Sequence, residues 1–135
     1  MLVGSRDFID RARLVRKALG GGMRQAGILA AAGLIALEEM PKRLGEDHAN
    51  ARLLAESLAE LPQVEIDLTT VQTNIVIFTV RGSSDPIPIL EKLKRRGIIA
   101  GTAADHQIRF VTHNDVDRAA CEEAARITVE VIGES

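Results

Sequence analysis

The chain has 135 residues, of which 46% are hydrophobic and 27% charged, with a formal net charge of −2. This near-neutral balance argues against a nucleic-acid partner, because DNA and RNA binding needs a basic face. A single cysteine, Cys121, excludes an internal disulfide framework and a four-cysteine zinc site, and it is typical of a reducing, cytoplasmic compartment. No signal peptide is evident, and the longest apolar stretch, residues 26–37, is too short to cross a membrane.

Helical periodicity dominates the first part of the chain. Residues 1–3 resemble the stub of a strand, and helices are expected over residues 6–19, 23–39 and 41–61. The first of these helices has a polar face and should be capped by Ser5. The helix at residues 23–39 is apolar nearly all round, which favours burial on most sides, with another subunit as the partner.

The periodicity changes to that of strands after Pro62. Strands are expected over residues 64–68, 74–80, 98–100 and 107–112, with helices over residues 86–96 and 116–132. Gly97 should close the first of these helices, and Asn114 or Asp115 should cap the second. The fold class is therefore α/β: a helical segment at residues 1–61, followed by a small α+β domain at residues 62–135. In that domain a strand–helix–strand–strand–helix module carries its helices on one face of the sheet.

Arg109 is the best candidate for a binding residue. It lies on a strand where it alternates with the apolar Ile108 and Phe110, so one sheet face carries a planar, two-pronged donor. That geometry suits a carboxylate bound through two hydrogen bonds. The pattern alone favours the alternative, an exposed edge arginine or one paired with an acid on a helix, because most strand arginines are solvated.

A glycine loop joins the first two expected helices. Gly20, Gly21 and Gly22 lead through Met23 to Arg24 at the start of the second helix. Free backbone N–H groups and the helix dipole favour an anion at such a position, and Arg24 would reinforce that preference. The alternative is a plain helix–loop–helix connection in which the glycines only serve the turn.

The histidines and lysines give weaker signals. No metal site is expected, because His48, His106 and His113 lack metal-ligand spacing. We interpret His48 as a polar helix residue, His106 as a loop residue and Cys121 as a small core residue. His113 follows the Arg109 strand and could line a site, but the pattern favours a structural role for it. The four lysines all fall on expected helices: Lys17, Lys42, Lys92 and Lys94.

Five runs in this order along the chain resemble the low-specificity L-threonine aldolase family. They lie at residues 4–9, 16–27, 46–51, 73–76 and 108–113, and the most specific are Gly-Gly-Gly-Met-Arg-Gln from residue 20 and Arg-Phe-Val-Thr-His from residue 109. The family comprises pyridoxal 5′-phosphate (PLP) enzymes with an aspartate-aminotransferase-like fold of type I. The resemblance implies that residues 1–61 correspond to the end of the PLP-binding large domain and its linker helices, and residues 62–135 to the small domain.

The resemblance also implies a function and its residues. Family members cleave threonine and allo-threonine to glycine and acetaldehyde, with PLP as the electron sink, and they form dimers or tetramers with active sites at subunit interfaces. By this resemblance Arg109 binds the α-carboxylate of a small amino-acid substrate, and Arg24 and Lys17 lie near the cofactor phosphate.

One part of the family pattern lies upstream of this chain. The family's Schiff-base lysine precedes the position that Met1 matches, so the chain is expected to be a C-terminal portion with no catalytic residue of its own and no activity alone. The alternative is a non-catalytic module that oligomerises or binds amino-acid carboxylates through Arg109. A gene product without a function is the third possibility.

Overall fold

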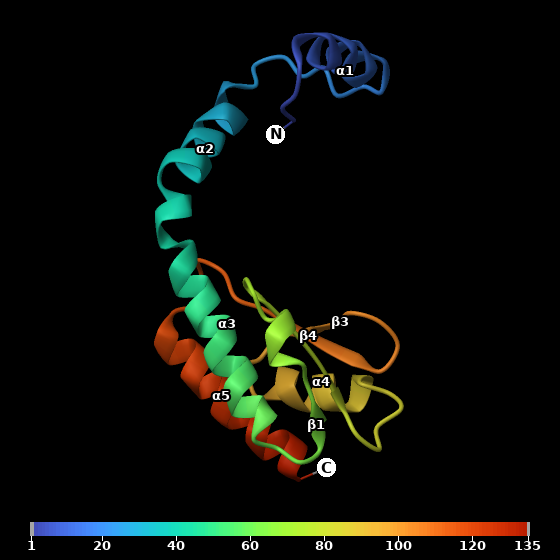
Figure 1. Cartoon of the computed structure of the whole chain (residues 1–135), viewed down its shortest axis with the longest axis vertical. Helices are drawn as coiled ribbons and strands as arrows, with labels where there is room; N and C mark the ends of the chain where they lie inside the picture. Colours follow the sequence, from blue (N-terminus) through green and yellow to red (C-terminus); the bar gives the residue numbers. More distant parts are fainter. Residues whose placement is uncertain (1, 135) are drawn as a thin grey trace. The chain divides into compact units, whose positions relative to one another are not determined.

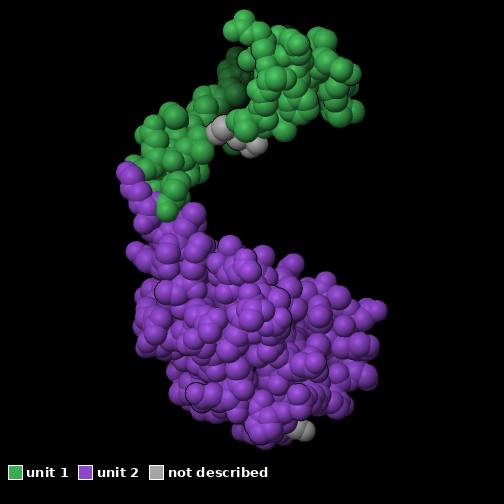
Figure 2. Space-filling view, viewed as in Figure 1, with its two compact units in different colours: residues 1–41 green, residues 42–135 purple. Residues whose placement is uncertain are grey.

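The structure is a computed structural model that describes residues 2–134. The chain divides into two compact units, residues 1–41 and residues 42–135, which are coloured separately in Figure 2. The strand stub expected at residues 1–3 lies partly outside the described residues, and Leu2 and Val3 form no strand. The two units are described in turn.

The first unit contains two helices, α1 (Arg6–Ala18) and α2 (Gly27–Glu38). Ser5 caps α1 as expected, because its side chain accepts a hydrogen bond from the backbone N–H of Phe8. The second helix begins at Gly27, four residues later than the sequence predicts. Gln25 has a φ of 47°, a left-handed conformation that interrupts a right-handed helix before it can form.

None of the described residues in the first unit is buried. Along α2, Ile28 is 85% exposed, and Leu29, Leu34 and Ile35 are each more than half exposed. The apolar character that predicts burial is present, but the described residues of the first unit do not cover this helix. The helix therefore presents a large apolar surface, of the kind that marks an interface in folded proteins.

The expected helix at residues 41–61 is divided in two. A 3-10 turn, η1 (Met40–Arg43), holds Pro41, and the α-helix α3 (Leu44–Ala59) follows it. Leu54 and Leu58 of α3 are buried in the core of the second unit. The structural boundary therefore falls at residue 41 instead of residue 61, because α3 packs with the sheet and with α5.

A four-stranded antiparallel sheet forms the second unit with its helices (Figure 1). The strands β1 (Val64–Glu65), β2 (Ile75–Val80), β4 (Gln107–Val111) and β3 (Gly101–Thr102) lie in that spatial order. The first strand ends at Glu65 instead of residue 68, because a 3-10 turn, η2 (Leu68–Thr70), takes up the end of the predicted strand. Asp67 caps that turn by accepting the N–H of Thr69.

The third strand also differs from the prediction. Residues 98–100 form no strand, although their sequence is apolar and β-branched. The helix α4 (Ile87–Arg95) ends in a turn at Gly97, whose φ is 87°, and the N–H of Ile98 donates back to Leu93 O at 3.0 Å. Because the N–H of Ile98 is engaged in closing the helix, the chain pairs with β4 only from Gly101 onward.

The core lies between one sheet face and the helices. Val76, Phe78, Ile108 and Phe110 point inward, and the rings of Phe78 and Phe110 meet edge to face at 5.4 Å. The last helix, α5 (Arg118–Gly133), completes this layer together with α3 and α4. Its cap is Asp117, which accepts the N–H of Ala120 at 2.8 Å, and not Asn114 or Asp115 as predicted. The module thus has its helices on one face of the sheet, as expected.

Candidate functional site

The other face of the sheet is open. On β2, Ile75 and Ile77 point away from the helices, and on β4 Arg109 and Val111 do the same. Arg109 stands between Ile77 on one neighbouring strand and Gly101 on the other. The guanidinium therefore lies in the middle of a mostly apolar, solvent-exposed surface.

Arg109 is exposed and uses none of its donors within the described residues, where no hydrogen bond or ion pair involves its side chain. The guanidinium lies over β3: a Cβ built on Gly101 would be 4.0 Å from Nη2 of Arg109. An acid on a helix, which the sequence left open as a partner, does not pair with Arg109 in this structure. The planar fork is free to bind a carboxylate through two parallel hydrogen bonds.

A buried polar cluster holds the end of β4 at Thr112, three residues after Arg109. The hydroxyl of Thr112 donates to the backbone oxygen of Asp47 at 2.6 Å, and the N–H of Thr112 donates to Asn74 O at 3.0 Å. The amide Nδ2 of Asn74 in turn donates to Thr112 O at 2.8 Å. These bonds join β4 to the start of β2 and to the first turn of α3.

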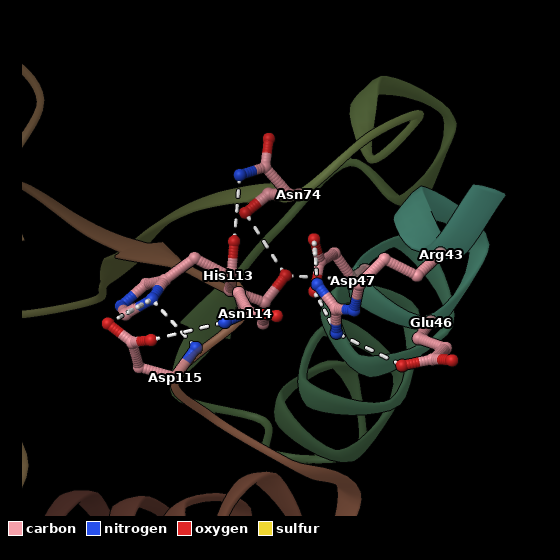
Figure 3. Close-up of polar contacts among 8 residues, drawn as sticks. Arg43, Glu46, Asp47, Asn74, His113, Asn114 and Asp115 are labelled. Atoms are coloured by element: carbon pink, nitrogen blue, oxygen red, sulfur yellow. Dashed lines mark hydrogen bonds and ion pairs between the residues drawn. The ribbon is translucent and has the colours of Figure 1, made fainter. Parts of the chain in front are cut away.

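The first turn of α3 has its own ion pairs (Figure 3). Arg43 donates to Glu46 Oε2 at 3.0 Å and to Asp47 Oδ2 at 3.4 Å. The side chain of Asp47 is only 6% exposed. Its Oδ1 atom lies 3.4 Å from Arg43 Nη2 but accepts no hydrogen bond from any described residue. The pair is therefore a partly desolvated anchor for the helix end and not a solvated surface contact.

His113 turns away from this cluster toward the loop that leads to α5. Its Nδ1 atom accepts the N–H of Asp115 at 3.3 Å and lies 3.7 Å from a carboxylate oxygen of the same residue (Figure 3). An Nδ1 that accepts a hydrogen bond leaves the proton on Nε2 in the neutral ring. His113 thus helps to form the turn after β4, which supports its structural interpretation.

In the first unit, two basic side chains pack on the glycine loop. A Cβ placed on Gly22 would be 2.8 Å from Cδ and 3.4 Å from Nζ of Lys17, and one placed on Gly21 would be 3.1 Å from Cγ of Arg16. Arg24 follows two residues after Gly22 and is exposed. The N-terminus of α2 has no side-chain cap. Lys17, in the last turn of α1, thus packs on the glycine loop that leads to Arg24, whereas Arg109 lies in the second unit.

The other residues considered from the sequence, His48, His106 and Cys121, occupy structural positions. His48 is half-buried on α3, and His106 is exposed in the loop before β4, where its Nδ1 contacts Ser84 O. Cys121 is buried as expected, and burial raises the pKa of its thiol. It lines an apolar cavity of about 320 Å³ beside Ile98 and Phe110. The described residues contain no cluster of three or more His, Cys, Asp or Glu side chains suited to a metal ion.

The four lysines all lie on helical segments: Lys17 on α1, Lys42 on η1, and Lys92 and Lys94 on α4. No helix within residues 2–134 combines the length and the apolar character needed to cross a membrane. Sequence reasoning did not find the roles of Asp47, Asn74 and Thr112, because their contacts join residues 38 to 65 positions apart. The only available signal was that each lies within one of the family-like runs.

Comparisons with known proteins agree with these observations. The family model described as beta-eliminating lyase matches residues 1–81. A low specificity L-threonine aldolase of Escherichia coli (strain K12) is 43% identical over 125 residues, which is 93% of this chain and 36% of that protein. The low-specificity L-threonine aldolase 1 of Arabidopsis thaliana is 34% identical over 96% of this chain and 38% of its own length. The chain thus spans little more than a third of these curated relatives.

Solved structures show the same fold. A mutant of C-DES with glycine covalently linked to its PLP cofactor has a TM-score of 0.60 and 29% identity, over 76% of this chain and 28% of that one. MppP soaked with the product 2-ketoarginine has a TM-score of 0.58 at 14% identity, over 73% and 30% of the two chains, which is a likeness of fold alone. These matches confirm the expected α+β module of a PLP-dependent, type I fold. On the family model and the sequence identities together, the chain belongs to the beta-eliminating lyase family and resembles the low-specificity L-threonine aldolases.

Proposed function

We propose that this chain is the C-terminal portion of a PLP-dependent lyase of the threonine aldolase type, and that Arg109 binds the α-carboxylate of its amino-acid substrate. The observation that carries the proposal is the free guanidinium of Arg109 at the centre of an open sheet face. It is supported by 43% identity to a threonine aldolase over nearly the whole chain. The substrates we propose are threonine and allo-threonine, which would be cleaved to glycine and acetaldehyde.

Arg109 would bind and orient the substrate. Two parallel N–H groups fix both oxygens of a carboxylate, so they define the direction of the bond from that carboxylate to the α-carbon. The side chains of the neighbours Ile77 and Val111 offer no hydrogen-bonding groups that would compete with the carboxylate for the fork. PLP, when bound, supplies the electron sink for breaking the bond between the α- and β-carbons of a β-hydroxy-α-amino acid.

The glycine loop of the first unit suits the phosphate of that cofactor. Gly22 has no side chain, and Lys17 packs into the space so released, with its Nζ beside the loop backbone. Arg24 adds a second cation before the uncapped N-terminus of α2. Backbone N–H groups, a helix dipole and two cations are the usual elements of a phosphate site. In our proposal Lys17 and Arg24 hold the phosphate, in this subunit or in a neighbouring one.

The Schiff-base lysine is not among the residues of this chain in our proposal. Lys17, Lys42, Lys92 and Lys94 all occupy helical positions, and none follows a strand in a loop. The purified chain is therefore expected to form no glycine from threonine when PLP is added. Glycine formation at a rate above that of PLP alone, and lost in Lys17→Ala, would overturn this part of the proposal.

The apolar character of α2 supports the further proposal of a homo-oligomer. A helix with apolar residues on nearly all sides needs more than one covering surface. A second copy of the chain is the partner we propose, as a dimer or tetramer. Sedimentation should show a concentration-dependent increase in mass that is reduced by Ile28→Glu.

The decisive experiment uses phosphopyridoxyl-glycine, a stable secondary amine that joins glycine to pyridoxyl phosphate and needs no lysine. We expect this probe to bind the chain more tightly than glycine does, because the probe presents both a carboxylate and a phosphate. Arg109→Lys, which keeps the charge but loses the two-pronged geometry, should weaken probe binding about ten-fold. Arg81→Lys, an exposed arginine of the same unit, is the matched control and should have no effect.

A second candidate function is a carboxylate-binding module that works without PLP. The observation that favours it is that Arg109 lies in a unit with its own core. Equal affinity for glycine and for phosphopyridoxyl-glycine, with both lost in Arg109→Lys, would support this alternative. Unchanged probe affinity in Arg109→Lys would refute both candidates.

A further inference from the structure

The strand that presents Arg109 is held unevenly on its two sides. On the β3 side the ladder pairs only Gly101 with Arg109 and Thr102 with Ile108. Val111 has no partner in β3, because the preceding segment turns back to close α4. The apolar cavity of about 320 Å³ lies beside the same stretch of β4. On the β2 side the ladder runs on to Val111, which pairs with Ile75, so the end of β4 is held from one side only, and a second restraint has to come from the residues that follow.

Thr112 supplies that restraint. It is only 2% exposed, and its hydroxyl donates to the backbone oxygen of Asp47 at 2.6 Å. The two residues are 65 positions apart, so this bond ties the end of β4 directly to the first turn of α3. Asn74 fixes the same residue from the β2 side, through its backbone oxygen and its side-chain amide.

The point to which Thr112 is tied is itself fixed. Asp47 lies in the first turn of α3, where Arg43 pairs with its carboxylate and with that of Glu46 (Figure 3). A backbone oxygen has two lone pairs, so Asp47 O can accept the hydroxyl without giving up a helical hydrogen bond. A continuous set of polar contacts thus runs from Arg43 to a residue three positions after Arg109.

We propose that Thr112 is a positioning residue: its hydroxyl bond to Asp47 O holds the end of β4 so that Arg109 presents its fork in the orientation that binds a carboxylate. The inference rests on the proposed role of Arg109. It assigns a function to a buried hydroxyl that touches neither substrate nor cofactor. Loss of the hydroxyl should loosen β4 beyond Arg109 and weaken carboxylate binding, although the Arg109 side chain itself is unchanged.

The test compares three variants of the full chain. Thr112→Val removes the hydroxyl at nearly constant volume, and Thr112→Ser keeps it. Thr128→Val is the matched control, because Thr128 is also fully buried and its hydroxyl also donates to a backbone oxygen at 2.6 Å, but within α5. Asn74→Ala, which removes only the side-chain amide that donates to Thr112 O, serves as a second variant if Thr112→Val does not fold.

Two measurements are made on each variant. Amide hydrogen exchange of Phe110 and Thr112, whose N–H groups face β2, reports how firmly the end of β4 is held, and titration with phosphopyridoxyl-glycine reports carboxylate binding. We expect Thr112→Val, or Asn74→Ala in its place, to accelerate exchange and to weaken binding, each by about five- to ten-fold. Thr112→Ser should remain within about two-fold of the natural chain, and Thr128→Val should match the natural chain in both measurements.

Results that differ from these expectations would overturn the inference, each for a different reason. Unchanged exchange in Thr112→Val would mean that the hydroxyl does not hold the strand. Faster exchange with unchanged affinity, or an equal loss of affinity in Thr128→Val, would reduce Thr112 to a general packing residue. Unchanged affinity in Arg109→Lys would refute the proposed function itself and so remove the role for which Thr112 is assigned.

Discussion

Removal of residues 1–41 is the perturbation whose outcome the structure predicts most sharply. Every buried apolar side chain among the described residues lies in the second unit, and none lies in α1 or α2. Since hydrophobic stabilisation scales with the apolar area removed from water, the first unit contributes little to it. A chain of residues 42–135 should therefore fold alone, with a free energy of unfolding within about 1 kcal/mol of the full chain.

A core substitution sets the scale for that comparison. Leu58 is fully buried between α3 and its neighbours, so Leu58→Ala should cost about 2–5 kcal/mol in either chain. The truncated chain should also lose the helical signal of α1, with 13 residues, and of α2, with 12 residues. This loss should occur without a matching loss of stability.

Urea unfolding followed by far-ultraviolet circular dichroism is the assay. The dependence of the unfolding free energy on urea tracks the surface exposed on unfolding, so the two chains should give similar slopes as well as similar midpoints. Deletion of the exposed apolar α2 should also reduce self-association, as measured by sedimentation. A truncated chain that loses more than about 3 kcal/mol, or that unfolds without a cooperative transition, would refute the reasoning.

Three further predictions concern single residues. Burial raises the pKa of the Cys121 thiol, so its reaction with a disulfide reagent at pH 8 should be at least about ten-fold slower in the native chain than in urea. The hydrogen bond from Arg96 lowers the pKa of Glu130 below its ordinary value of 4.5. The ionised Glu130 side chain should therefore stabilise the fold above pH 4.5, and this stabilisation should be lost as the pH falls below that value. In Glu130→Gln, the free energy of unfolding should change less with pH over that acidic range. Gly97→Ala should cost about 1 kcal/mol in urea unfolding, because φ is 87° there, and an unchanged midpoint would contradict the turn.

Local rules account for much of the fold. Alternation places Arg109 on the face opposite Ile108 and Phe110, and the structure has that arrangement. The apolar, β-branched run at residues 75–80 is enough to predict β2, and the position of Ser5 just before a helix is enough to predict its capping role. Each of these features depends on residues within a few positions of one another, which is the range that periodicity and capping rules describe.

Features decided by competition were harder to predict. Residues 98–100 have strand propensity, yet the N–H of Ile98 is used to close α4. Asn114, Asp115 and Asp117 all precede α5, and Asp117 is the one that caps it. The bond from Thr112 to Asp47 joins parts of the chain that no local pattern connects. The first two cases are decided between competing local hydrogen bonds, and the third depends on a tertiary contact.

The free guanidinium on the open sheet face has a practical consequence for solution chemistry. An arginine side chain without a protein partner can donate its paired hydrogen bonds to phosphate or sulfate as well as to a carboxylate. Because Arg109 is exposed, dissolved salt also screens its charge. Buffer anions therefore become competitors, and selectivity for an amino acid has to come from whatever surrounds the bound molecule on its other sides. If Arg109 binds a carboxylate as proposed, the open sheet face alone selects for an anionic group, and a particular molecule is recognised only when something else encloses it.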